Sequence, residues 1–254
     1  MRRASLLVVV GFALACGGEP ANGRDAADVT SDSCGSGLDC PQPDPGSEEG
    51  DLTLPGDAAS LVSRGVHCEL TWTTPGDANQ RDSGPGLGAD MDLHFLHPLA
   101  TGSDVDGDGQ PDGWFDPTHD LFWANMHPTW ETSDPAACGP SLDLDDTDGS
   151  GPENTNVEPF RNGGVYRVGV HYWDEHGFGP SRPRVKCHMG GTLVIDSDLE
   201  ALGRSMHPGD LWEVATFKWP QGIAAVVLNT DGTLKITPNY SNPNYPLGSV
   251  KPTL

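Results

Sequence analysis

Residues 65–72 read Gly-Val-His-Cys-Glu-Leu-Thr-Trp, and in this run Val66, Cys68, Leu70 and Trp72 alternate with polar residues. Successive side chains of a β-strand point to opposite faces of its sheet, so the pattern predicts a strand with one face in a core. Similar short strands are predicted at 90–95, 165–172, 183–189, 191–195, 211–219, 223–228 and 233–236. Residues 229–232, Asn-Thr-Asp-Gly, predict a hairpin turn between the last two, because Asp-Gly tolerates positive φ.

Strands this short, separated by turn residues, predict an all-β fold of the β-sandwich or jelly-roll kind, in a single domain over residues 61–254. The 33 Gly and 23 Pro residues favour a loop-rich protein and disfavour long helices. One short helical turn is predicted at Ser197-Asp198-Leu199-Glu200, which has the form of a capping box before Gly203.

Residues 1–15 have the form of a bacterial lipoprotein signal peptide. Arg2 and Arg3 precede an apolar stretch, Leu6 to Ala15, which is too short to span a bilayer because that takes about 20 residues. The stretch leads into Ala13-Leu14-Ala15-Cys16, which resembles a lipobox and implies lipid attachment at Cys16. The alternative is ordinary secretory cleavage beside an incidental cysteine.

Residues 16–60 are rich in Gly, Pro, Ser, Ala and Asp, which predicts a lipidated, disordered linker. Gly17, where an aspartate would retain a lipoprotein elsewhere, resembles the outer-membrane sorting signal of Gram-negative lipoproteins. We therefore expect a cell-envelope protein anchored in the outer membrane, on its periplasmic or its cell-surface side. Its contact with the lipid bilayer is expected to be through acyl chains only.

The charge of the chain argues against nucleic acid as a partner. The formal net charge is −23, and removal of residues 1–15 takes away two of 14 basic residues and none of 37 acidic ones, which leaves 12 − 37 = −25. Nucleic acids and anionic lipid surfaces both attract clusters of Lys and Arg, so neither is expected to bind this surface directly.

Five cysteines remain besides Cys16, and their number fits an oxidising compartment. Cys34 and Cys40 flank a short loop and are a candidate local disulfide. Cys68 and Cys187 lie on the apolar faces of predicted strands. They are either a disulfide between two sheets or two unlinked core thiols.

An acidic segment is the most informative feature of the sequence. No Lys or Arg occurs between Arg81 and Arg161, whereas the same interval holds 17 Asp and Glu residues. Crowded carboxylates raise one another's pKa and destabilise a fold unless opposite charge is present. That charge comes either from distant Lys and Arg or from a bound cation, and with no basic residue nearby in sequence we expect a cation.

Residues 104–116 contain the first ligand-like cluster. Its predicted ligands are Asp104, Asp106, Asp108, Gln110, Asp112 and Asp116. The aspartates at relative positions 1, 3, 5 and 9, with Gly109 at the bend, match a calcium loop in which Gln110 would offer its backbone carbonyl. Position 12 is Phe115, and Asp116 stands one place later. The run resembles the Asp-rich calcium repeats of thrombospondin type 3 and dockerin domains; a solvated acidic turn is the alternative.

Residues 141–154 contain the second cluster. Its predicted ligands are Asp143, Asp145, Asp146, Asp148, Glu153 and Asn154. Leu142 and Leu144 are expected to face the core, before a Gly-rich turn that carries the later donors. Carboxylate and amide oxygens suit calcium, so we expect one or two Ca²⁺ ions in the protein, with an acidic turn of capping aspartates as the alternative.

Three segments together, residues 90–98, 142–154 and 166–172, resemble the YfaP-type domain of exported bacterial proteins, a domain of unknown function. The resemblance covers roughly residues 62–220, and Gly151-Pro152-Glu153-Asn154 is its most specific part. It implies a β-sandwich in which Asp92 helps the second cluster to hold its ion. Relative to that pattern the 104–112 loop resembles an insertion.

Histidines and catalytic motifs give little support to an enzyme. His94 and His97 lie on a strand followed by proline, so their rings face differently; structural roles are expected for them and for His171 and His176. The sequence contains no His-Glu-x-x-His, Gly-x-Ser-x-Gly, phosphate-loop or Cys-x-x-Cys motif. No catalytic residue is assigned.

The predicted function is a membrane-anchored, calcium-stabilised β-sandwich that binds a partner or supports a structure and is not an enzyme. The candidate partner is a surface glycan or protein. Aromatic residues at 114–115, 122–123 and 130 would form either a stacking platform for sugars or lids over the core. The alternatives are a metal- or carboxylate-dependent surface hydrolase, for example on glycans, and a passive coat lipoprotein.

Overall fold

The computed structural model describes residues 65–81, 84, 86–107, 109–130, 139–158, 160, 163–242, 244–246 and 251. The predicted signal peptide, the linker, the lipid site Cys16 and the candidate pair Cys34–Cys40 lie outside these residues, as does Asp108. Within the described residues no helix is long and apolar enough to cross a bilayer.

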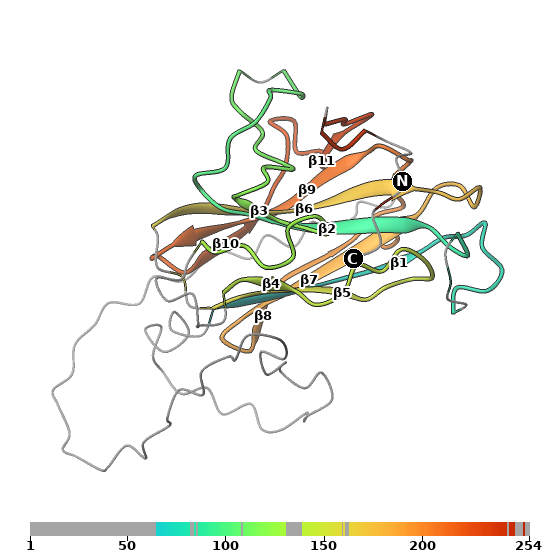
Figure 1. Cartoon of the computed structure of the whole chain (residues 1–254), viewed down its shortest axis with the longest axis horizontal. Coiled ribbons are helices and arrows are strands. Elements are labelled where there is room, and N and C mark those ends of the chain that lie inside the picture. Colours follow the sequence, from blue (N-terminus) through green and yellow to red (C-terminus); the bar gives the residue numbers. More distant parts are fainter. Residues whose placement is uncertain are drawn as a thin grey trace, which may run out of the picture. The chain divides into compact units, whose positions relative to one another are not determined.

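The strands form two antiparallel sheets that face each other as a β-sandwich, which confirms the predicted fold class (Figure 1). The first sheet has the order β4 (Ser141–Leu142), β5 (Glu153–Val157), β1 (Val66–Thr73), β7 (Arg182–Met189) and β8 (Thr192–Asp198). The second has the order β10 (Ile223–Val226), β9 (Leu211–Trp219), β6 (Gly164–Asp174), β2 (Asp90–Leu96) and β3 (Asp120–Leu121), and β11 (Lys235–Thr237) also pairs with β9.

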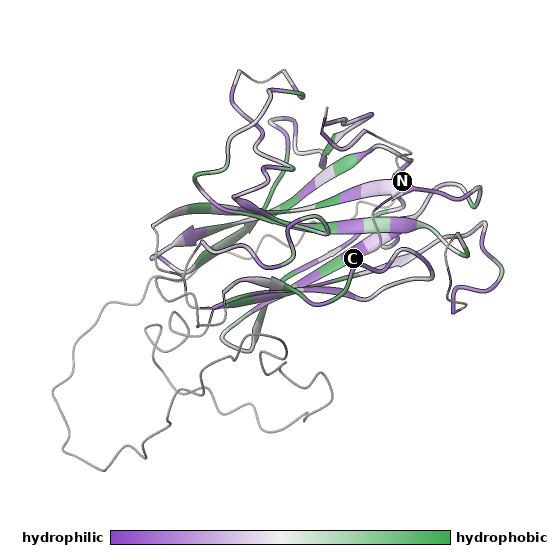
Figure 2. Ribbon diagram, in the orientation of Figure 1, coloured by the Kyte–Doolittle hydropathy of each residue, from purple (hydrophilic) through white to green (hydrophobic). Residues whose placement is uncertain are grey.

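The core lies between the sheets and is built by the predicted alternation. Buried and partly exposed residues alternate along β1 and β7, and Figure 2 shows the matching alternation of hydrophobic and hydrophilic residues along several strands. Met91, Leu93 and Phe95 of β2 are fully buried, as predicted. A tight turn is present at 229–232, closed by the Gly232 amide, which donates to the Asn229 carbonyl at 2.9 Å. The predicted hairpin is corrected, because β10 and β11 on either side of this turn both pair with β9, and a single bridge between Leu228 and Leu234 joins the two segments.

A disulfide joins Cys68 to Cys187, so these residues are not the unlinked thiols of the alternative prediction. The expectation that such a bond would bridge two sheets is wrong. Cys68 of β1 and Cys187 of β7 are direct partners in one antiparallel ladder, so the bond lies within the first sheet.

The predicted helical turn at Ser197–Glu200 is corrected by the structure. Ser197 and Asp198 are the last residues of β8, and the chain then turns without forming a helix. The Asp198 carboxylate accepts a hydrogen bond from the Ala201 amide at 3.1 Å, so the capping residue is Asp198. Ser197 is instead paired with Val185 in the β7–β8 ladder.

The aromatic residues at 114–115, 122–123 and 130 are lids over the core. Their exposed fractions run from 0% for Phe122 to 8% for Trp130, so they offer no stacking platform for sugars. Trp114 lies against β6 at Gly169, where an added Cβ would come within 2.8 Å of the Trp114 ring. This covering segment packs over His94 on the polar side of β2, and all seven residues of that strand are buried.

The chain passes repeatedly from one sheet to the other, which places β2 of the second sheet against β5 of the first. β3 pairs with β2 only at Phe95 and Leu96, so among the described strands none flanks the start of β2 on that side. Carboxylates from distant parts of the chain gather there.

Candidate functional site

The 104–112 loop brings three of its predicted ligands together. Asp104, Asp106 and Asp112 each offer a carboxylate oxygen, and these atoms lie within 4.8 Å of one another; we call these residues the loop cluster. The loop is organised by its own backbone, because the Asp104 carboxylate accepts the amides of Gly107 at 2.7 Å and Gly109 at 2.9 Å. Gly107 and Gly109 have φ of 78° and 87°, a conformation that glycine adopts at little cost.

A lysine from another strand contacts the loop cluster. Lys235 of β11 places its ammonium 2.8 Å from Asp106 and 2.7 Å from Glu213 of β9. Arg167 of β6 lies 3.5 Å from Glu213 and donates to the Asp112 carbonyl. Burial raises the pKa of Asp112, and the neighbouring Asp106 carboxylate adds to the rise, although the Val105 amide opposes it.

Two other predicted ligands of this loop take different places. Gln110 is exposed, and its side-chain amide donates to the Gly109 carbonyl at 3.0 Å. Asp116 lies apart from the loop cluster and accepts the amides of Thr101, Thr118 and His119 at 2.8 to 3.0 Å. Burial by itself would raise the pKa of Asp116, but these amides hold it below its usual value. Asp116 is thus a turn-capping residue.

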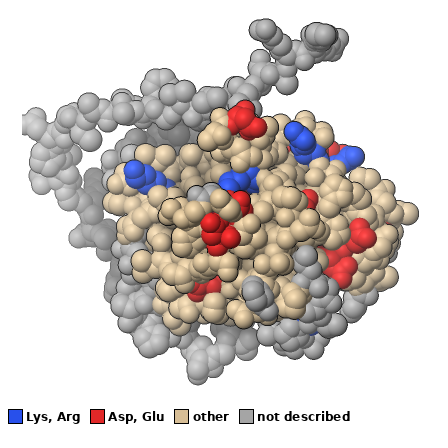
Figure 3. Space-filling model, turned by 90° about the horizontal axis from the view of Figure 1, so that it is seen from above, with Lys and Arg blue, Asp and Glu red and all other residues tan. Residues whose placement is uncertain are grey.

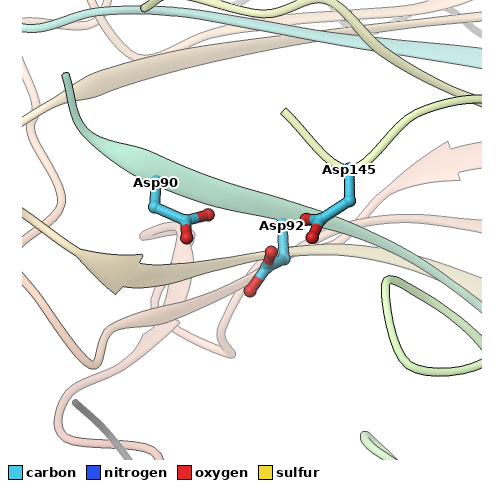
Figure 4. A group of neighbouring side chains, drawn as sticks. All are labelled: Asp90, Asp92 and Asp145. Carbon is cyan, nitrogen blue, oxygen red and sulfur yellow. The ribbon is translucent and has the colours of Figure 1, made fainter. Parts of the chain in front are cut away.

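A second group of carboxylates meets at the open start of β2. Asp90 and Asp92 of β2 and Asp145, which follows β4, have carboxylate oxygens within 4.8 Å of one another, and Figure 4 shows the three side chains turned toward one another. Glu153 of β5 is fully buried beside them and accepts the Leu93 amide at 2.7 Å and the Asp146 amide at 3.0 Å. We call these four residues the buried cluster.

The buried cluster holds a lysine ammonium. Lys251 Nζ donates to Asp90 at 2.7 Å, to Asp145 at 2.8 Å and to Asp92. Its side chain is 7% exposed, and Nζ lies 5.5 Å from the centre of the Trp123 ring and 5.8 Å from that of Trp173. The charge-compensating residue is therefore remote in sequence from the acidic segment.

One ammonium does not neutralise four carboxylates. Burial raises the pKa of Asp90 well above its ordinary value, and the Asp92 charge adds to the effect. Burial likewise raises the pKa of Glu153 well above its ordinary value, again with Asp92 contributing. Asp92 differs, because Lys251 and His171 outweigh its burial and lower its pKa. With all four ionised, the group would carry −4 + 1 = −3.

Three predicted ligands of the second cluster and one predicted core residue lie elsewhere. Asp143 is exposed and accepts from the Asn156 side chain at 2.9 Å, and Asn154, on β5, faces Glu69 in the ladder. Asp148 accepts the Gly84 amide in a separate turn. Leu144, expected to be in the core, is 57% exposed. The Gly-rich turn ends earlier than predicted, because β5 begins at Glu153.

Asp146 lies next to the buried cluster, but its carboxylate is not among those that contact Lys251. Its amide donates to Glu153, and its carboxylate accepts the Asp148 amide at 3.3 Å. Burial raises the pKa of Asp146 to about 6. The turn thus fixes Glu153 through the backbone.

Three of the four predicted structural histidines, His94, His97 and His171, are packed among aromatic residues, whereas His176 is partly exposed and hydrogen-bonds to the Gly88 carbonyl at 2.7 Å. His94 Nδ1 lies 2.7 Å from the Asp120 carboxylate, and its ring stacks on Phe122 with centroids 5.2 Å apart. His171 faces Asp92 across the β2–β6 ladder, with its Nδ1 3.8 Å from Asp92 Oδ2. Burial lowers the pKa of His171, although Asp92 opposes the shift.

Sequence reasoning missed Asp90 and Lys251. Asp90 stands two residues before Asp92 on a predicted strand, so it shares that side chain's direction and could have been found. Lys251 carries no local signal, because it lies 159 residues from Asp92 in sequence.

The acidic side chains visible in Figure 3 lie in small separate groups, some of them beside a Lys or Arg. An open groove of about 600 Å³ also adjoins the loop cluster. It is lined by Asp106, Asp231, Lys235 and residues 228–230 and 236–238. The groove thus borders the loop cluster through Asp106.

Comparison with protein-family models, with curated proteins and with solved structures found no match. No similar protein therefore indicates a role for these residues. Both clusters are groups of acidic residues that could hold a metal ion.

Proposed function

We propose that the protein is an exported lipoprotein, held at the outer membrane through Cys16, that displays a calcium-stabilised β-sandwich as a binding or structural module. The observation that carries the calcium part is the loop cluster, in which Asp104, Asp106 and Asp112 converge within 4.8 Å on a backbone already turned by Gly107 and Gly109. The YfaP-type resemblance belongs to the same proposal and supports it through the Asp92 and Glu153 positions.

The donor atoms favour calcium over the other common protein metals. Carboxylate oxygens make up both clusters, and no cysteine or histidine contributes an atom to either. Calcium takes about six to eight oxygen ligands in flexible arrangements, whereas zinc prefers nitrogen and sulfur and magnesium demands a tighter octahedron. A loop that supplies several carboxylates at adjustable positions therefore suits calcium.

Calcium would stabilise this fold by joining elements that are far apart in sequence. The loop cluster is tied to β11 through the Asp106–Lys235 contact and to β6 through the Asp112 carbonyl and Arg167. An ion that binds the folded loop and not the unfolded chain raises the free energy of unfolding by mass action. The stabilised loops would then face a surface glycan or a protein partner.

Thermal melting in calcium and in chelator tests the proposal. At a calcium concentration about one hundred times the dissociation constant, the gain is about 2.7 kcal/mol, which raises the melting temperature by roughly 5 °C or more. Asp106→Asn is expected to remove most of that response. Glu200→Gln makes the same charge change at an exposed site outside both clusters, and this variant should keep the calcium-dependent rise in melting temperature. An identical melting temperature with millimolar calcium and with chelator would contradict the calcium part.

The anchor is tested separately by labelling cells with radioactive palmitate. The wild-type protein should take up label and fractionate with the outer membrane, whereas Cys16→Ser should remain unlabelled. Labelling that persists in Cys16→Ser would overturn the assignment of the lipid site.

A metal-dependent hydrolase is the second candidate, and the groove beside the loop cluster is the observation that favours it. The groove brings Asp106 and Asp231 to one opening together with Lys235, and paired carboxylates are the groups that glycosidases use. Release of reducing ends from envelope polysaccharide, abolished by Asp106→Asn and by chelator, would favour this candidate over a module.

A further inference from the structure

Lys251 occupies the position of a bound cation in the buried cluster. Its ammonium contacts one oxygen from each of Asp90, Asp92 and Asp145. The two β2 carboxylates are fixed by the β2–β6 ladder, and Asp145 lies between two short strands. Lys251 belongs to no strand. Two of the three carboxylates therefore belong to a sheet, and the third follows the short strand β4.

A single ammonium leaves part of this cage unsatisfied. Within the described part of the chain, Asp92 Oδ2 is buried and has no hydrogen-bond partner, and the same is true of His171 Nδ1, which lies 3.8 Å from it. Both side chains are 1% exposed. A buried polar atom without a partner costs free energy comparable to a lost hydrogen bond, so a single ammonium does not satisfy the whole cage.

Each of the three aspartates turns one carboxylate oxygen to the Lys251 ammonium, and these oxygens lie within 4.8 Å of one another. Converging carboxylate oxygens are the ligands that calcium prefers. Lysine supplies three donors and one positive charge, whereas a divalent cation supplies two charges and can use both oxygens of a carboxylate. A metal ion and the Lys251 ammonium cannot occupy this position together, because an ion bound to these oxygens would lie in contact with Nζ.

We propose that the buried cluster is a second divalent-cation site, with Lys251 as its resting occupant, and that calcium binding there displaces the Lys251 side chain. The inference rests on the proposed calcium dependence of the domain and adds a competition between the metal and an internal ammonium. Displacement would also withdraw the ammonium from the Trp123 and Trp173 rings.

Lysine footprinting of the unaltered protein tests the displacement. Reductive methylation followed by mass spectrometry should find Lys251 protected in chelator and several-fold more reactive in calcium. Lys218, which is exposed on β9, is the internal reference and should react equally in both. Protection of Lys251 that is unchanged at a calcium concentration that saturates the protein would overturn the proposal.

Calorimetric titration with calcium tests the competition. When an internal group occupies a site in most molecules, the apparent affinity falls by the fraction that remains open, so Lys251→Met should bind calcium at this site at least about tenfold more tightly than wild type. Lys218→Met is the matched control and should bind as wild type does. Equal affinity and stoichiometry in Lys251→Met and wild type would refute the competition.

The two proposals fail in different ways. If calcium stabilises the wild type through Asp106 while Lys251 stays protected, the proposed function stands and the second site is ruled out. Calcium that neither binds nor stabilises the wild type or Lys251→Met removes both.

Discussion

The loop cluster and the buried cluster hold the same kind of side chain in opposite surroundings. Asp104 is exposed and satisfied by the backbone amides of its own loop. Asp92 is fully buried, and its charge depends on Lys251. In the first case water and local amides stabilise the carboxylate, whereas in the second the main stabilising charge is a side chain from the other end of the domain, with His171 adding to it. Burial, more than composition, thus decides how much a counter-ion matters.

The largest expected effect comes from removing the counter-ion of the buried cluster. Lys251→Met in chelator should lower the free energy of unfolding by about 3 kcal/mol or more, because an unpaired buried charge is left behind. Denaturant unfolding measures this loss of stability, and calcium should restore much of it. Lys218→Met should cost little. A Lys251→Met protein as stable as wild type in chelator would mean that the buried carboxylates need no cation.

A smaller loss is expected from Glu153, which joins the two sheets. Glu153→Ala removes the acceptor of two backbone amides, those of Leu93 and Asp146. We expect a cost of about 2 to 3 kcal/mol, since one buried and one partly buried donor lose their partner. Glu200→Gln, at the surface, is the comparison. If Glu153→Ala unfolds at the wild-type denaturant concentration, the link between the sheets is not stabilising.

The loop cluster should respond more weakly. Asp104→Ala takes away the acceptor of the Gly107 and Gly109 amides, but water can replace it, so the expected cost in chelator is about 1 kcal/mol. The same variant should lose the calcium-dependent rise in melting temperature. A cost as large as that of Lys251→Met would erase the contrast between the two clusters.

The smallest effect is expected at the exposed pair on β7 and β8. Arg184 donates two hydrogen bonds to Asp196, both at 2.8 Å, and these lower the pKa of Asp196. A lowered carboxyl pKa gives stability that is present above the unfolded-state value and lost as pH falls through the folded-state value. The free energy of unfolding of Asp196→Asn should therefore depend slightly less on pH than that of the wild type as the pH falls below about 4.

Because Asp196 is mostly exposed, the total change should stay under about 0.5 kcal/mol. Chemical denaturation at pH 3 and at pH 7 compares the two proteins. A loss above about 1 kcal/mol at neutral pH would show that surface pairs matter here as much as buried ones.

Sequence patterns predicted the sandwich because its strands alternate with a period of two. The predicted strand at 211–219 coincides with β9, and Met91, Leu93 and Phe95 face the core as expected. The pattern failed where tertiary contacts override it. Leu144 is apolar yet exposed, and Glu153 is charged yet buried on β5, because the chain turns and joins β1 there. Local propensity cannot report such a contact.

By itself, the sequence determined the strand period, the turn at 229–232 and the loop cluster, because each is encoded within about a dozen neighbouring residues whose spacing fixes their geometry. Only the tertiary structure decided which carboxylates meet at the start of β2 and that Lys251 lies among them. It also decided that the Cys68–Cys187 bond lies within one sheet. These contacts join residues far apart in the chain, and they arise from how the two sheets pack.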